Sequence, residues 1–164
     1  MLINRLHYND GKTHTLSADI AFNGEEYSSS VIRRIKDCHV ELKITDYDSI
    51  FRIEIHLKSN VVVGCAYTLE DVDYVVKTND GFDFTDEPLD EEDDVLIAMD
   101  STIIDLKPYI YSMIVAAIPL KVVKKGAVPP SDGVGYRVLS EEEFEKEKNT
   151  KTDSRWNALD DLDL

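Results

Sequence analysis

The chain lacks the features of a secreted or membrane-spanning protein. Only two cysteines, Cys38 and Cys65, occur among its 164 residues, and they form neither a CxxC pair nor a disulfide framework. Such sparse use of cysteine is typical of a reducing cytosol. The longest apolar stretch, residues 109–118, is interrupted by Ser112 and is far shorter than the ~20 residues that span a bilayer. The first ten residues contain no continuous apolar segment, so we expect no signal peptide and a cytoplasmic protein.

The sequence also lacks the short motifs of common enzyme classes. GxGxxG, GxxxxGKS/T and GxSxG are absent, and the four histidines show no metal-ligand spacing. A cysteine nucleophile would need Cys65 beside a histidine, and the sequence does not decide whether His39 or His56 lies on a neighbouring strand. A small apolar residue in a sheet is the simpler interpretation of Cys65. We therefore predict a protein that is not an enzyme and has neither a cofactor nor a metal site.

Acidic residues are abundant and unevenly placed. The formal net charge is −15, and residues 65–100 alone hold 13 acids and 1 base. Within residues 83–94, eight of twelve positions are acidic and none is basic, which predicts a solvated loop. The spacing of these acids does not match the calcium loop, whose oxygen ligands alternate around a central glycine. A negative field of this kind attracts basic proteins and repels phosphate backbones.

Two small basic patches are the places where the sequence favours contact with RNA. One holds Arg33, Arg34 and Lys36, and the other holds Lys121, Lys124 and Lys125. Patches of this size are common on solvated surfaces, but both lie near aromatic or apolar segments. Contact with RNA through Arg33, Arg34, Lys121, Lys124 and Lys125 is therefore an alternative hypothesis.

The pattern of apolar residues predicts an α+β fold. Residues 39–44 and 51–58 alternate between apolar and polar side chains, and the turn-forming residues 45–49 between them predict an antiparallel hairpin. Residues 61–63, 72–76 and 95–99 have strand composition, and the N-terminal residues 2–6 and 16–22 are expected to add edge strands. We therefore expect a curved antiparallel sheet, or a sheet closed into a barrel-like core.

Two helical segments complete the prediction. An apolar helix capped by Asp105 is expected to run through Ile118, to be buried on most sides and to fill the core. Ser140 and Glu143 form a capping box for a short charged helix, and a further amphipathic segment begins at Asp153. We divide the chain into a β-rich core domain of residues 1–139, with the acidic loop 83–94 and the helix 105–118, and a tail of short helices, residues 140–164.

Three blocks of residues resemble the YceD family. Residues 61–72 (VVVGCAYTLEDV) are similar to a family signature in which a strand ends in Cys-Ala-Arg-Thr-Leu-Glu-x-Val, with Tyr67 in place of the arginine. The second block runs from Ile104 through the apolar helix to the sequence IPLK at residues 118–121. The third, DSRW at residues 153–156 ahead of spaced leucines, resembles an Asp-Pro-Arg motif with Ser154 in place of the proline. The resemblance extends over roughly residues 40 to 164.

This resemblance implies a function that composition alone does not. Family members are cytoplasmic bacterial proteins, with plastid relatives, implicated in accumulation and processing of large-subunit ribosomal RNA. Many carry extra cysteines after the second block, in what looks like a metal-binding insert, and this chain has none there. The motif residues that the resemblance marks for partner contact are Cys65, Thr68, Leu69, Glu70, Asp105, Asp153 and Arg155.

A protein partner is the leading expectation. The genes of the family commonly neighbour that of a small basic ribosomal protein, so we expect a non-enzymatic factor that binds this protein or a pre-ribosomal particle. The acidic segment would speed the encounter with such a chain. The alternatives are direct rRNA binding through the basic patches and a hydrolase that acts through clustered carboxylates.

Overall fold

The structure, a computed structural model, describes residues 1–22, 31–89 and 95–150. The elements in chain order are β1 (Leu2–Asn4), the 3-10 helix η1 (Arg5–His7), β2 (His14–Asp19), β3 (Ile32–Asp46), β4 (Phe51–Gly64), β5 (Asp71–Thr85), β6 (Leu96–Ala98), β7 (Ile103–Asp105), α1 (Lys107–Ala117) and α2 (Glu141–Thr150). The predicted α+β class is confirmed.

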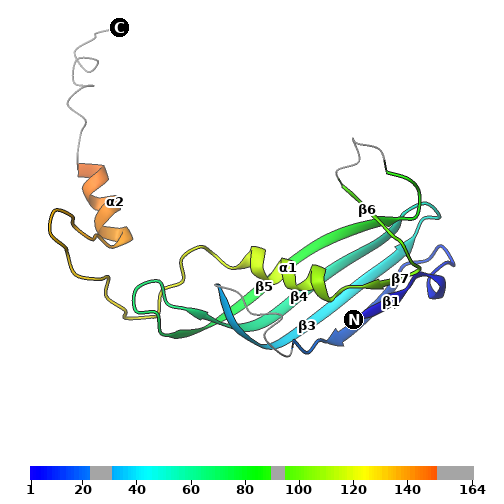
Figure 1. The fold of residues 1–164 in the computed structure, drawn as a ribbon, viewed down its shortest axis with the longest axis horizontal. Helices are drawn as coiled ribbons and strands as arrows, with labels where there is room; N and C mark the ends of the chain where they lie inside the picture. Colours follow the sequence, from blue (N-terminus) through cyan, green and yellow to red (C-terminus); the bar gives the residue numbers. More distant parts are fainter. Residues whose placement is uncertain (23–30, 90–94, 151–164) are drawn as a thin grey trace, which may run out of the picture.

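The main sheet is long, curved and open. Its strand order is β2-β3-β4-β5-β6, and every pair is antiparallel except β5 and β6, which run parallel. Figure 1 shows β3, β4 and β5 side by side along the length of the molecule. Because the two outer strands of this order do not pair with each other, the expected barrel-like closure is wrong.

The predicted central hairpin is confirmed. β3 and β4 pair over nearly their whole lengths, and Asp48 takes a left-handed φ of 64° in the turn between them. The alternation read from the sequence gives the buried face: Val40, Leu42 and Ile44 on β3 and Phe51, Ile53, Ile55 and Leu57 on β4 are buried. This face forms the floor of the core.

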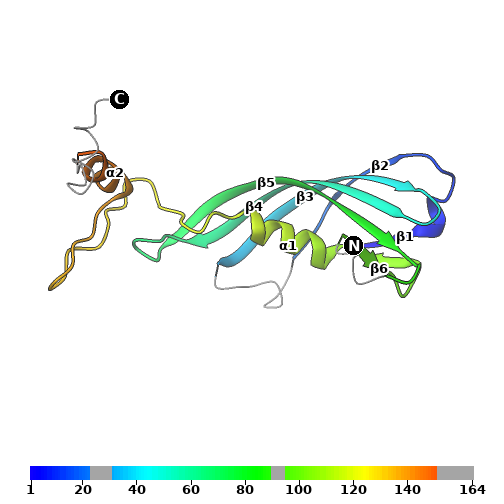
Figure 2. The same cartoon turned by 90° about the horizontal axis from the view of Figure 1, so that it is seen from above.

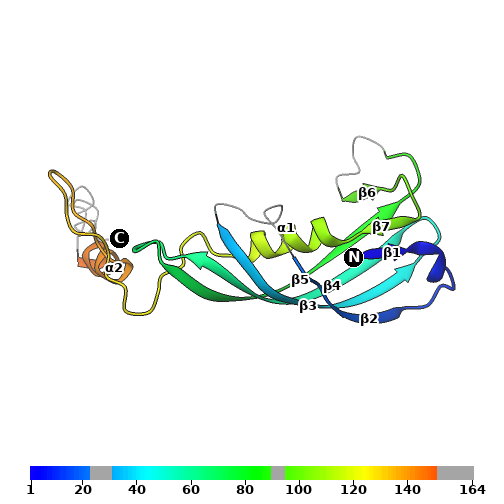
Figure 3. The ribbon, with the colours of Figure 1, turned by 60° about the horizontal axis from the view of Figure 1, so that its bottom comes forward.

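Helix α1 covers the buried face of the sheet. Ile110, Met113 and Ile114 are buried and belong to the same apolar cluster as β3, β4 and β5. Figures 2 and 3 show the helix lying along one side of the curved sheet, with the opposite face left open. Ser112 and Ala116 are exposed, so one face of α1 remains open, while its other sides are buried or half-buried, as predicted. Neither described helix is long and apolar enough to cross a membrane.

The two N-terminal strands have different partners. β2 forms the edge of the main sheet beside β3, as expected, but β1 pairs with β7 in a separate two-stranded sheet in which Ile3 lies opposite Ile104. The amide of Arg5 also donates to the carbonyl of Thr102 at 2.8 Å. Long-range pairing of this kind leaves little trace in the local sequence pattern.

The predicted acidic loop begins later than the composition indicates. Strand β5 continues through Asp83, Phe84 and Thr85, and Phe84 is buried opposite Phe51 of β4. Phe82 and Phe84 alternate with polar residues in the strand period, which the high acid content of residues 83–94 masked. Residues 90–94 lie outside the described part of the chain.

The C-terminal helix α2 begins at the predicted capping box. The amide of Ser140 donates to the Glu143 carboxylate at 2.8 Å, and the amide of Glu143 donates to the Ser140 hydroxyl at 3.3 Å. Figure 1 places α2 beyond the end of the sheet that holds the β4–β5 connection. Asp153, Arg155 and the amphipathic segment that was expected to begin there lie outside the described residues.

Candidate functional site

The connection between β4 and β5 holds the most specific motif of the sequence. Residues 65–70 (CAYTLE) form a compact turn closed by two backbone hydrogen bonds: the amide of Leu69 donates to the carbonyl of Cys65 at 2.9 Å, and the amide of Cys65 donates to the carbonyl of Glu70 at 2.8 Å. Leu69 takes a φ of 57°, in the left-handed region that non-glycine residues rarely adopt. We call residues 65–70 the motif turn.

Cys65 lies at the centre of the motif turn. Its side chain is fully buried, and its Sγ accepts a hydrogen bond from the backbone amide of Lys124 at 3.4 Å. This amide, together with a hydrogen bond from the Thr68 side chain, lowers the pKa of the Cys65 thiol to about 7. The other cysteine is the opposite case, because burial raises the pKa of Cys38 to about 11. The motif turn therefore favours the thiolate form of Cys65.

The segment that follows α1 packs against the motif turn. The amide of Ala66 donates to the carbonyl of Val122 at 2.8 Å, and the Lys124 Nζ lies 2.8 Å from the Glu70 carboxylate. The Lys124 hydrogen bond lowers the pKa of Glu70. The Lys121 Nζ lies 4.9 Å from the centre of the Tyr67 ring. Two blocks that are more than 50 residues apart in the chain thus form one structural unit.

Two irregularities in β3 bring bases of the first patch to the same end of the sheet. The pairing of β3 with β4 shifts between Ile32 and Arg34 and again between Ile35 and Asp37, so Arg33 and Lys36 are the unpaired extra residues. Bulges of this kind re-aim the side chain that they insert. The Arg33 guanidinium reaches the Asp71 carboxylate and, at 2.6 Å, the carbonyl of Leu69. Lys36 lies 2.5 Å from Asp73 of β5.

Comparison with known proteins identifies the family. The sequence profile described as "Large ribosomal RNA subunit accumulation protein YceD" matches residues 53–163, about two thirds of the chain. The chain belongs to the YceD family. Comparisons with the curated proteins and with the solved structures give no significant match. The matched residues begin in β4 and include the motif turn, β5 and α1, whereas β1, β2 and β3 precede them.

The YceD motif residues do not all gather at one place. Cys65, Thr68, Leu69 and Glu70 lie in the motif turn, but Asp105 lies at the start of α1, the end of the helix remote from Lys121 and Lys124. There its carboxylate accepts a hydrogen bond from the amide of Lys107 at 3.1 Å and pairs with the Met1 ammonium at 2.8 Å. Both contacts fix the start of the helix. Asp153 and Arg155 cannot be placed because they lie outside the described residues.

Several bases of the two predicted basic patches already contact other side chains of the protein. Arg33 pairs with Asp71 and Lys124 with Glu70, so acids of the motif turn and of β5 already compensate both charges. The Lys121 ammonium lies over the ring of Tyr67. Arg34 and Lys125 are exposed. The patches thus contribute to holding the YceD motif turn together.

At the other end of the sheet the structure holds a buried ion pair that sequence reasoning missed. Arg5 donates from Nε and Nη2 to the two carboxylate oxygens of Asp46 at 2.8 Å, and both side chains are at least nine-tenths buried. Its Nη1 lies 3.2 Å from Asp86, and the carbonyl of Asp48 accepts a further bond. The single guanidinium joins η1, the β3–β4 turn and the start of the acidic segment. The partners are more than 40 residues apart, so the local sequence carried no signal.

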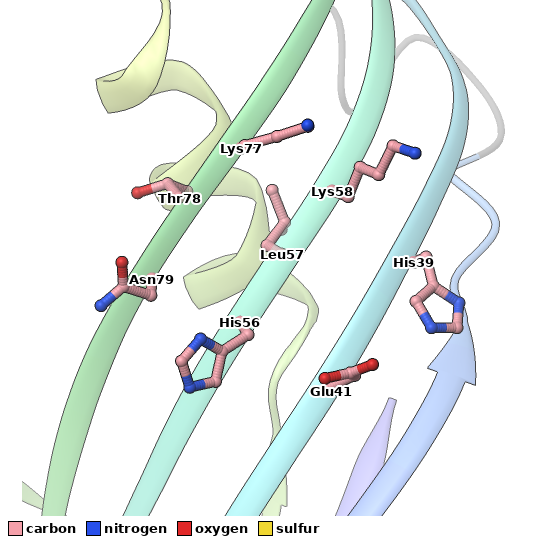
Figure 4. Close-up of a pocket in the computed structure, with 8 residues that line it drawn as sticks. All are labelled: His39, Glu41, His56, Leu57, Lys58, Lys77, Thr78 and Asn79. Atoms are coloured by element: carbon pink, nitrogen blue, oxygen red, sulfur yellow. The ribbon is translucent and has the colours of Figure 1, made fainter.

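A shallow depression of about 410 Å³ lies on the open face of the sheet and is lined mostly by polar side chains, including two of the four histidines. Figure 4 shows His39, Glu41, His56, Lys58, Lys77 and Asn79 projecting from β3, β4 and β5. His39 bonds Asp19 at 2.7 Å and Ser17 at 3.1 Å. His56 lies on β4 nine residues before Cys65, which follows the end of that strand, and His39 lies opposite Lys58, seven residues before Cys65. At the rise of a strand these separations are about 30 and 20 Å. Neither histidine can therefore contact the Cys65 thiol.

Lys58 and Lys77 lie directly opposite each other in the pairing of β4 and β5. Like charges in this position destabilise a sheet, and neither lysine pairs with an acid among the described residues. This uncompensated charge is the strongest feature of the open face.

Among the described residues, no group of three or more His, Cys, Asp or Glu side chains is arranged to hold a metal ion.

Proposed function

We propose that this protein supports accumulation of large-subunit ribosomal RNA by binding a basic ribosomal protein or an assembly intermediate that contains one, without catalysing a reaction. The family description connects it with the large subunit. The concentration of 12 net negative charges in residues 65–100 is the observation that carries the mode of action, because such a segment attracts a cationic chain.

The structure supplies a surface on which this charge is exposed. Asp86 and Glu87 are exposed directly after β5, and Asp48 is exposed in the neighbouring β3–β4 turn. Arg5 is the base that contacts this group, and its two hydrogen bonds to Asp46 direct most of its charge to that buried carboxylate. The exposed acids therefore keep most of their negative charge for a partner. Tyr47, which is also exposed, adds an aromatic contact beside them.

The test compares two variants that lose the same number of negative charges from different regions of the chain. One variant neutralises the seven acids between residues 86 and 94 with Asn or Gln. The matched control neutralises seven acids of the C-terminal region: Glu141, Glu142, Glu145, Glu147, Asp160, Asp161 and Asp163. Each full-length variant is titrated with RNase-treated proteins extracted from large ribosomal subunits. We expect the first variant to lose capture of the basic proteins and the control to keep it.

Equal binding by the wild type and the first variant would refute the proposal. An equal loss in both variants would also refute it, because it would show that total charge rather than a specific surface attracts the basic proteins. Circular dichroism of each variant shows whether the fold is kept. Among the replaced acids that the structure describes, Asp86 contacts Arg5 and Glu147 contacts Arg137, and Arg5 keeps its pair with Asp46 when Asp86 is replaced. We therefore expect both variants to fold.

Direct contact with rRNA is a second candidate, favoured by one observation on the open face of the sheet. Lys58 and Lys77 lie opposite each other beside His39 and His56 in the depression shown in Figure 4, and a phosphate group would compensate their charge. The variant Lys58→Gln/Lys77→Gln tests it in a titration with a large-subunit rRNA fragment. The expected result is weaker binding and a shallower dependence on salt. The control Lys43→Gln, on the same face of β3, should keep the wild-type values, and an unchanged salt slope in the double variant would exclude this site.

A further inference from the structure

Strand β5 has a free edge along most of its length. It pairs with β4 from Asp71 to Phe84, but β6 pairs on its other side with Asp83, Phe84 and Thr85 alone. In the part of the chain that the structure describes, no strand pairs with residues 71–82 on that side. Figure 1 shows β5 as the outer long strand of the sheet, with β6 at one end of it.

The backbone groups that face this edge can be assigned from the hydrogen bonds at its end. The carbonyl of Thr85 accepts from the amide of Met99 at 2.7 Å, so the backbone groups of Thr85 point away from β4. The pairing with β4 contains no register shift, and backbone groups alternate sides along a strand. The amides and carbonyls of residues 73, 75, 77, 79 and 81 therefore face the free edge. The Gly81 amide is already bonded to the Asp80 carboxylate at 2.8 Å.

The side chains beside the edge differ between the two faces of the sheet. On the helix-covered face, Tyr74 and Phe82 are half-buried, and Tyr109 of α1 lies 5.1 Å from Phe82 between ring centres. On the open face, Val75 is half-exposed and lies between Asp73 and Lys77. A strand added here would place alternate side chains against aromatic rings and against a polar surface that carries charges of both signs. That arrangement fits a segment in which apolar and charged residues alternate.

The charges of β5 decide the sign of the partner. β5 holds Asp71, Asp73, Asp80 and Asp83 and the single base Lys77. A second copy of β5 paired in antiparallel register about Lys77 would set Asp71 opposite Asp83 and Lys77 opposite itself, and like charges directly opposite each other destabilise a sheet. Charges on edge strands commonly prevent self-association. Asp71, Asp73 and Asp83 already pair with Arg33, Lys36 and Arg52. The negative charge that attracts a basic strand is therefore that of Asp80 and of the exposed Asp86 and Glu87, which follow β5.

We propose that the free edge of β5 binds an extended, lysine- or arginine-bearing segment of the basic ribosomal protein by strand addition. This inference rests on the proposed function, and it names the element and the backbone groups that would make the contact. Main-chain hydrogen bonds supply the binding, and the aspartates and half-buried aromatic side chains select the sequence. The mode differs from simple charge attraction because it requires particular amides of β5.

The experiment removes edge amides while side-chain losses are held equal. In the full chain, Val75→Pro/Asn79→Pro lacks two amides that face the edge, and Val75→Ala/Asn79→Ala keeps them. Proline is tolerated at edge positions whose amide faces outward. The probe is a synthetic ten-residue peptide of alternating Lys and Val, with a Glu-Val peptide as the control. We expect the proline variant to bind the Lys-Val peptide about tenfold more weakly than the alanine variant, the effect of losing two net hydrogen bonds.

Amide hydrogen exchange of the wild-type chain is the second measurement, and it does not depend on the folding of a variant. Binding of the Lys-Val peptide should slow exchange at residues 73, 75, 77 and 79 and leave the even-numbered residues of β5, already paired with β4, unchanged. Equal affinities of the two variants, or no added protection at the odd-numbered residues, would overturn the inference. Equal binding of the Glu-Val peptide, or dimerisation of the chain through β5 in sedimentation, would also overturn it.

The two proposals fail in distinguishable ways. If the proline variant still captures large-subunit proteins as the alanine variant does, while neutralising residues 86–94 abolishes capture, the proposed function stands and strand addition is refuted. If the Lys-Val peptide protects β5 but the wild type captures no large-subunit protein, the proposed function is refuted, and the edge remains a binding site for basic strands.

Discussion

Cys65 is a buried cysteine whose surroundings favour the charged form of its side chain. The amide of Lys124 and the Thr68 side chain both donate to its sulfur and lower its pKa to about 7. Buried cysteines more often have a raised pKa, as Cys38 does. The difference arises because the motif turn and the segment after α1 point hydrogen-bond donors at one sulfur and not at the other.

The pH dependence of stability should report this difference. A lowered pKa in the folded state stabilises the fold above the unfolded pKa of about 8.5, and this contribution is lost as the pH falls through 7. We expect the free energy of unfolding to rise between pH 7 and 8.5 in the wild type, relative to Cys65→Ala. Denaturant unfolding at several pH values measures it.

Ultraviolet absorbance of the thiolates provides an independent test. Taken as the difference between the wild type and the variants Cys65→Ala and Cys38→Ala, which cancels the absorbance of the eight tyrosines, it should show a step near pH 7 from Cys65 and a step near pH 11 from Cys38. The variant Thr68→Val removes a donor and should move the lower step to higher pH without affecting the upper one. A single step near the ordinary pKa of a thiol would contradict the assignment.

At the scale of elements, Arg5 connects three segments that are distant in the sequence. Its side chain joins η1 to Asp46 at the end of β3 and to Asp86 after β5. The pair with Asp46 is buried, so loss of the arginine leaves a buried carboxylate without its counter-charge. Such uncompensated charges are among the costliest defects in a folded protein.

We expect Arg5→Met to lower the free energy of unfolding by about 3–5 kcal/mol, the usual cost of breaking a buried ion pair. The matched control is Arg52→Met, whose half-exposed side chain contacts Glu54 and Asp83 at 3.5 and 3.4 Å and should cost about 1 kcal/mol or less. The double variant Arg5→Met/Asp46→Leu removes both charges and should recover most of the loss. Equilibrium unfolding in urea measures all three, and equal effects of Arg5→Met and Arg52→Met would contradict the prediction.

The elements that the sequence predicts well are those whose partners are close in the chain. The hairpin of β3 and β4, the apolar helix between Asp105 and Pro119 and the capping box at Ser140 each follow from a local period or a local pair of residues. The separate sheet of β1 and β7 joins residues about 100 apart, and the buried Arg5–Asp46 pair joins residues 41 apart. Local periodicity carries no information on such contacts.

The candidate site likewise has one part that the sequence predicts and other parts that it does not. The motif turn is recognisable from the sequence CAYTLE because a compact turn needs particular residues in order. The sequence could not predict the contacts of Lys124 with Cys65 and Glu70, because they depend on the path of the chain after α1. It could not predict the pair of Arg33 with Asp71 either, because that pair depends on where β3 is bulged. Asp105 was grouped with the motif by resemblance, and the structure places it at the opposite end of α1.

At the scale of the whole molecule, the positions of the charges distinguish attraction by the total net charge from attraction by one concentrated acidic segment. The described bases Arg33, Lys36 and Lys124 each pair with an acid near the motif turn. The net charge of −15 therefore comes chiefly from other acids, above all the eight within residues 83–94. A field that is concentrated in this way acts on the rate of encounter more than on the lifetime of the complex.

Association kinetics should therefore depend steeply on salt. We expect the association rate constant for the large-subunit protein that the chain captures best to fall by about tenfold between low and physiological ionic strength, while the dissociation rate constant changes little. Neutralising the acids of residues 86–94 should flatten this dependence more than neutralising seven acids of the C-terminal region, although both variants have the same net charge. Stopped-flow measurements at several salt concentrations give the two slopes. Identical slopes would mean that the total charge, and not its concentration beside β5, guides the partner to the protein.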